Sequence, residues 1–138
     1  MAITAAFPNQ AKLDALQLLC PSGSTYKAAL YTSAAALSKA TTAYTATGEV
    51  SGTGYTAGGA TLTGYSAALD TDTAVLDFAD PSWASSTITA RGMLIYNTTN
   101  ANKAVAVLDF GADISSTNGT FTVTLPAPTA AAGLVRIG

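Results

Sequence analysis

Hydrophobic and polar residues alternate in short segments along most of the chain, which is the pattern of β-strands with one buried face. The clearest alternation is Phe121, Val123 and Leu125, which are separated by threonines, and the clearest long strand is expected at 103–110. We expect strands in the segments 27–32, 41–50, 60–69, 74–78, 83–90, 93–97, 103–110, 120–125 and 134–137. Threonine and aromatic residues are frequent in these segments and favour the pleated backbone.

A different period occurs near the N-terminus, where leucines at helical spacing predict one amphipathic helix over 9–20. We expect residues 1–8 to form an extended arm and Asn9 to be the N-cap of this helix. Pro21 and Gly23 end the pattern. A helix this short is marginal by itself, so it should dock on its own domain or on a neighbour.

Short strands separated by Gly, Asn, Asp and Ser predict an all-β fold, and we expect a jelly-roll-like β-sandwich. Asn118–Gly119 is a hairpin signal. The pattern shows no helices between the strands, which argues against a parallel α/β sheet. The expected division is an arm and helix over 1–24 and one sandwich domain over 25–138. The expected core consists of Leu62, Val75, Leu76, Phe78, Ile95, Val105, Val107, Phe121, Val123 and Leu125.

The composition narrows the possible functions. Hydrophobic residues make up 49% of the 138 residues, charged residues only 10%, and the net charge is −2. So few basic groups argue against nucleic-acid binding, and we expect no membrane segment. Without histidine and with only Cys20, the chain lacks the usual zinc ligands, a disulfide and a His-activated nucleophile. We therefore expect no enzyme activity, no catalytic residue, no metal and no cofactor, and expect Cys20 to be a buried hydrophobe.

Three groups of residues could carry chemistry, and each has a simpler structural interpretation. The glycines of 52–59 lack the following helix and the lysine of a phosphate loop, so we interpret them as a flexible turn-rich segment. The aspartates of 70–80 lack the spacing of a calcium loop and are typical of turn caps. Five aromatic residues could form a sugar platform, but such rings more often fill a core or an interface. These are Tyr44, Tyr55, Tyr65, Trp83 and Tyr96.

Small, weakly polar side chains dominate where charged ones are usual, which suggests a surface that is covered in an assembly. The segments 26–33 (YKAALYTS), 42–44 (TAY) and 48–59 (GEVSGTGYTAGG), with Trp83, 88–92 (ITARG) and 103–111 (KAVAVLDFG), resemble small virion proteins of tailed DNA phages. The resemblance covers about 26–126 and is closest to the cement, or decoration, proteins of short-tailed phage heads.

This resemblance implies a non-enzymatic capsid protein, made in the host cytoplasm, that binds the exterior of an icosahedral head. Its implied partners are the major capsid protein and a second copy of itself in a homodimer. We predict partner contacts through Ile3, Phe7, Leu13, Leu16 and Tyr55. Three alternatives stay open: a tail or fibre module of the virion, a carbohydrate-binding β-sandwich, and a soluble domain of unusual composition.

Overall fold

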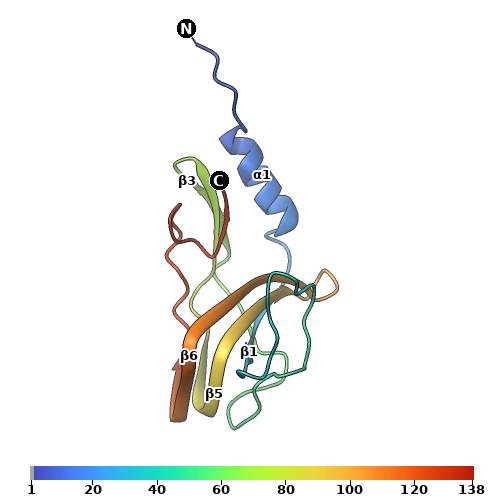
Figure 1. Ribbon diagram of the computed structural model, residues 1–138, viewed down its shortest axis with the longest axis vertical. Coiled ribbons are helices and arrows are strands. Elements are labelled where there is room, and N and C mark those ends of the chain that lie inside the picture. The colour runs from blue at the N-terminus through green and yellow to red at the C-terminus, as the bar shows by residue number, and fades with distance from the viewer. Residues whose placement is uncertain (1) are drawn as a thin grey trace. The chain divides into compact units, whose positions relative to one another are not determined.

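The computed structural model describes residues 2–138 and shows a mostly β chain with one helix (Figure 1). All strand pairs are antiparallel, and they form two sheets. The all-β class expected from the alternating pattern is therefore confirmed. In chain order the elements are α1 (Asn9–Leu19), β1 (Tyr26–Tyr31), β2 (Ala60–Thr61), β3 (Ser66–Asp70), β4 (Thr73–Asp77), β5 (Ser82–Asn97), β6 (Lys103–Thr122) and β7 (Val135–Ile137).

The chain forms two compact units, each built from separate stretches of sequence. Unit 1 contains the chain up to Gly23 together with 64–78 and 125–138, and unit 2 contains 24–63 and 79–124. The division expected from the sequence, 1–24 and 25–138, stays a prediction. The contacts within the chain group 64–78 and 125–138 with α1 in unit 1.

Unit 1 consists of α1 and the three-stranded sheet β3–β4–β7. The helix is docked by Leu16, which is fully buried, and by Cys20 at its end, which is buried as the sequence indicated. Lys12 is buried along its stem, and its Nζ donates to the backbone oxygen of Asp72 at 2.6 Å. The predicted N-cap is wrong: Asn9 is the first helical residue after Pro8, and its amide donates to the Asp72 carboxylate at 2.8 Å.

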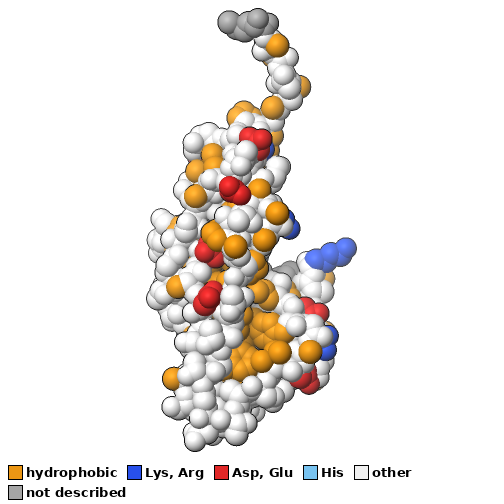
Figure 2. Space-filling view, turned by 90° about the vertical axis from the view of Figure 1, so that its left-hand side faces the viewer, with side chains coloured by type: hydrophobic (Ala, Val, Ile, Leu, Met, Phe, Trp, Pro, Cys, Tyr) orange, Lys and Arg blue, Asp and Glu red, His pale blue; other side chains and the backbone are white. Residues whose placement is uncertain are grey.

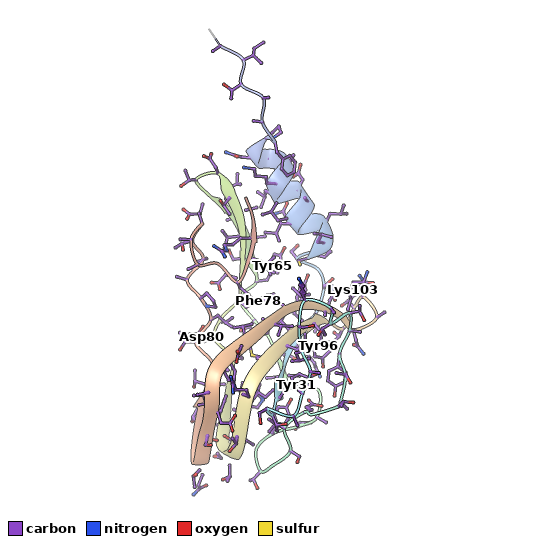
Figure 3. The ribbon with its side chains drawn as sticks, viewed as in Figure 1. Tyr31, Tyr65, Phe78, Asp80, Tyr96 and Lys103 are labelled. Atoms are coloured by element: carbon purple, nitrogen blue, oxygen red, sulfur yellow. The ribbon has the colours of Figure 1, made fainter. Side chains whose placement is uncertain are left out.

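Unit 2 is a four-stranded sheet in the order β2–β1–β5–β6. Strand β1 lies between β2 and β5 and is buried along almost all of its length. On one face, Tyr31 and Tyr96 pack with Ala29 and Leu94 beneath the segment that contains Leu37. Figure 3 shows Tyr31 and Tyr96 projecting from these neighbouring strands.

Strands β5 and β6 are far longer than the sequence indicated, and Figure 1 shows them as two curved strands side by side. The predicted break between 83–90 and 93–97 does not exist, and the predicted Asn118–Gly119 hairpin is wrong. Asn118 instead adopts a φ of 46° within β6, and its N–H donates to Thr87 Oγ1. A neighbouring side chain thus satisfies the backbone where a turn was expected.

Irregular register explains the curvature of these strands. Between the pairs Gly92↔Asp109 and Ala90↔Ile114, β6 carries extra residues, and Gly111 there adopts a φ of 79°. Such a bulge bends a strand and interrupts its regular pairing. The expected strand over 41–50 is also wrong, since this segment makes only isolated bridges, at Ala43 and Glu49.

The predicted core is confirmed at eight of its ten positions: Leu62, Val75, Leu76, Phe78, Ile95, Phe121, Val123 and Leu125. The two exceptions lie on β6. Val105 is half-buried and Val107 is 39% exposed. Both lie on β6, which is the last strand of its sheet and so has a neighbouring strand on one side only.

Candidate interaction surface

The most notable surface feature of unit 2 is an apolar groove beside β6. Its volume is about 300 Å³, and its floor is formed by Tyr31, Leu37 and Val107. Thr32, Ser33, Ala35, Arg91, Gly92, Leu108 and Asp109 complete the lining. Figure 2 shows hydrophobic side chains gathered in a hollow in this part of the chain, with charged side chains at its border.

The groove lies next to a strand edge whose backbone groups can be assigned from the pairing. The oxygens of Tyr26 and Leu30 accept hydrogen bonds from Leu62 and Val50, so even-numbered residues of β1 point away from β5. Odd-numbered residues of β1 therefore bond β5, through their partners Tyr96, Leu94 and Gly92. Because successive residues of a strand point to opposite sides, the odd-numbered residues of β5 bond β6.

Met93 and Ile95 of β5 pair with Leu108 and Ala106 of β6. It follows that the N–H and C=O groups of Val107 and Asp109 point to the outer side of the sheet, whereas Val105 is the extra residue of a bulge between Ala104 and Ala106. Among residues 2–138, no strand pairs with β6 on that side. The segment 42–44 covers only its first residues, since Ala104 donates to Thr42 and Tyr44 donates to Asn102.

An ion pair between Arg91 and Asp109 lies at one end of this open edge. Arg91 Nε lies 3.0 Å from Asp109 Oδ1, and both side chains are well exposed. The pKa of Asp109 is lowered, first by the N–H of Gly111 and then by Arg91. Arg91 and Asp109 are the only charged residues among the lining residues, and they pair with each other, so the lining carries no net charge.

The loop segments of unit 2 between β1 and β2 are held in place by a partly buried carboxylate. Glu49 accepts hydrogen bonds from the hydroxyls of Tyr44 and Tyr55, each at 2.6 Å, and from the N–H of Gly58 at 2.8 Å. The hydroxyl of Tyr96 donates to Gly58 O at 2.6 Å, and the rings of Tyr44 and Tyr96 stack at 4.8 Å. We call Glu49 and these contacts the Glu49 cluster.

Burial dominates the titration of these tyrosines. Burial raises the pKa of the Tyr31 hydroxyl to about 12. Burial and then the hydrogen bond to Glu49 raise the pKa values of Tyr44 and Tyr55. The hydroxyls therefore stay protonated at neutral pH and act as donors to fixed acceptors, which is a structural role.

The glycine-rich segment 52–59, which we interpreted as flexible, belongs to this cluster and is tightly held. Gly59 has a φ of 85°, and a Cβ on it would lie 1.8 Å from the oxygen of Ala28. Only glycine fits so close to β1. The glycines of this segment are needed because its backbone lies close to β1, and not because the segment is flexible.

The residues predicted to bind partners fall in both units. In unit 1, Ile3 is fully exposed and Phe7 half-exposed, while Leu13 is half-buried and Leu16 is fully buried against its own unit. Tyr55 lies in unit 2, where its hydroxyl belongs to the Glu49 cluster. The alternating pattern gave no signal for the groove, or for the exposed Leu18 and Leu19 at the end of α1.

The remaining chemical candidates have structural contacts. Trp83 is buried and packs edge-on against Phe121 at 6.1 Å, so it offers no open ring face to a sugar. Asp70 accepts from the N–H of Ala130 and Asp72 from the side-chain amide of Asn9, so these carboxylates join segments far apart in sequence, whereas local turn caps were expected. Within residues 2–138 no cluster of three or more His, Cys, Asp or Glu side chains could hold a metal ion.

No helix in the described part of the chain has the length and apolar character needed to cross a membrane. Comparison of the chain with protein-family models, with curated proteins and with solved structures found no match.

Proposed function

We propose that this chain is a non-enzymatic capsid protein of a tailed phage, which decorates the exterior of an icosahedral head and cements neighbouring major capsid subunits. The jelly-roll-like arrangement of the sheets and the homodimer expected from the resemblance are part of this proposal. The observation that carries it is an exposed apolar helix end, Leu18 at 81% and Leu19 at 68%, in a chain with 10% charged residues.

The physical mechanism is repeated burial of this kind of surface. Covering an exposed leucine contributes about 1 to 2 kcal/mol, so one copy binds modestly. Two linked copies on a shell that repeats the same site gain effective concentration without any new type of contact. Each copy that spans a seam between capsid subunits adds contacts that must break before the shell opens.

The test uses heads of the virus that encodes this chain, produced without it, to which the purified protein is added back. We expect saturation at a fixed number of copies per head and a higher temperature of DNA release. Leu18→Asp with Leu19→Asp should lower the apparent affinity more than about tenfold, because about 1.4 kcal/mol corresponds to tenfold. Leu69→Asp, which changes another exposed leucine of unit 1, is the matched control and should bind like the wild type.

Two results would contradict the proposal. Heads without the protein could release DNA at an unchanged temperature, which excludes cementing. The protein could instead be found in purified tails or fibres and not on heads, which favours the tail or fibre module.

Carbohydrate binding is the second candidate function, because unit 2 also has a groove of about 460 Å³ lined almost entirely by hydroxyl groups. Its lining is Thr32, Glu49, Ser51, Thr87, Ile88, Thr89, Ser115, Ser116 and Thr117. Hydroxyls and one carboxylate could bind sugar hydroxyls. Glycan-array binding that is lost in Thr87→Val with Thr89→Val would favour this function over cementing.

A further inference from the structure

We propose that residues 2–8 of one copy add as a short strand to the open edge of β6 in a second copy, with Ile3 and Phe7 over the groove. The inference concerns association of the chain with itself and does not depend on the capsid role. It rests on two uncovered features of one molecule, an apolar arm and an apolar groove beside an unpaired strand edge.

The arm has the composition of a strand that lacks a sheet. Residues 2–8 carry no charged side chain, form no regular secondary structure, and extend away from α1 (Figure 1). Ile3 is fully exposed, so nothing in the chain covers it. In an extended backbone Ile3, Ala5 and Phe7 would share one face, because side chains alternate with period two.

The arm and the edge match in length. From Ile3 to Phe7 an extended chain spans about 13 Å, as does β6 from Val105 to Asp109. Within this edge Val107 and Asp109 offer outward N–H and C=O groups, which an added strand can bond. Pro8 has no N–H and would end the pairing where the helix begins.

The two surfaces also match in chemistry. The floor of the groove is Tyr31, Leu37 and Val107, and its two charges form the Arg91–Asp109 pair. An uncharged arm with two large apolar side chains can cover this floor without burying an unpaired charge. An acidic or basic peptide would gain no opposite charge here.

A second copy is the occupant that accounts for both features at once. Every molecule supplies one arm and one groove, so two copies that exchange arms leave neither feature uncovered and form a closed two-fold dimer. In a single chain Ile3 is fully exposed and Val107 keeps 39% of its surface exposed, so both can still bury apolar surface against a partner.

The test is the mass of the full chain in solution, measured by sedimentation equilibrium over a range of concentrations without any phage particle. We expect a monomer–dimer equilibrium. Ile3→Asp with Phe7→Asp removes the arm's apolar face, and Val107→Lys places a charge in the groove. Each should raise the dissociation constant at least about tenfold. Ile114→Lys, at an exposed position of β6 outside the groove, is the control and should stay within about twofold.

Mixing gives a sharper test. The arm variant keeps its groove and the groove variant keeps its arm, so an equal mixture should form a heterodimer through one exchanged arm. The arm variant changes exposed residues only and should keep the circular dichroism spectrum of the wild type, so the test survives even if Val107→Lys does not fold.

Three results would overturn the inference. The wild type could be monomeric at all concentrations, which would mean that the arm contacts its own chain or a different protein. The dimer could persist in the arm variant, or the mixture could fail to associate. A monomeric wild type would also remove the homodimer from the proposed function, whereas the other two results would leave that homodimer in place. Binding to heads is decided separately by the reconstitution test.

Discussion

Removing the Glu49 carboxylate should destabilise unit 2 strongly. In Glu49→Ala the hydroxyls of Tyr44 and Tyr55 and the N–H of Gly58 lose their shared acceptor. Three hydrogen bonds to a charged group at about 1.5 kcal/mol each give roughly 4 to 5 kcal/mol. Glu49 is only partly buried, so water can replace some of this loss, and we expect a decrease of about 3 kcal/mol in the free energy of unfolding.

The assay is thermal unfolding followed by the fluorescence of Trp83, whose ring lies 6.1 Å from that of Tyr55. A loss of 3 kcal/mol in a chain of this length corresponds to a decrease in Tm of roughly 10 °C. Glu49→Gln keeps one oxygen acceptor and should fall between Glu49→Ala and the wild type. Asp109→Asn, which alters an exposed carboxylate, should change stability by less than about 0.5 kcal/mol. A Tm for Glu49→Ala within about 2 °C of the wild type would refute the role we give to this cluster.

Three further predictions concern other parts of the fold. The contribution of Tyr31 to stability should be fully present below about pH 10 and be lost between about pH 10 and 12: burial raises the pKa of Tyr31 to about 12 in the folded state, so folding favours the protonated hydroxyl, and a flat pH profile of Tm from pH 10 to 12 would contradict this. Gly59→Ala should cost roughly 2 to 4 kcal/mol in a urea titration, because its Cβ would collide with Ala28 O at a positive φ, whereas Gly23→Ala, with open space around it, should cost little. Lys12→Met should cost about 1 kcal/mol by the same titration, since it removes the donor to Asp72 O, and equal losses in the exposed Lys39→Met would argue against a specific bond.

Local patterns predicted the elements whose stability is local. The helix over 9–20 and the strand at 27–32 follow from spacing, and eight of ten predicted core residues are buried. The pattern failed where distant residues decide. Asn118–Gly119 looks like a turn, but Thr87 of the neighbouring strand satisfies its backbone.

The candidate surface was beyond sequence reasoning for the same reason. Val107 alternates like a core residue, and only the order of strands places it at the sheet's edge. Leu16 was expected to contact a partner because it is a helical leucine, but the docking of α1 buries it in its own unit. The exposed arm residues could be identified because nothing in 2–8 predicts a partner within the chain.

The bulge around Gly111 has a consequence for the solubility of this protein. A twenty-residue edge strand with few charges would ordinarily be at risk of pairing edge to edge with other molecules and forming fibrils. The bulge interrupts the regular ladder between Asp109 and Ile114, and further register shifts lie on both sides of it, so no regular edge runs along the whole strand. Such interruptions hinder continuous strand-to-strand pairing between molecules and so oppose aggregation along this edge.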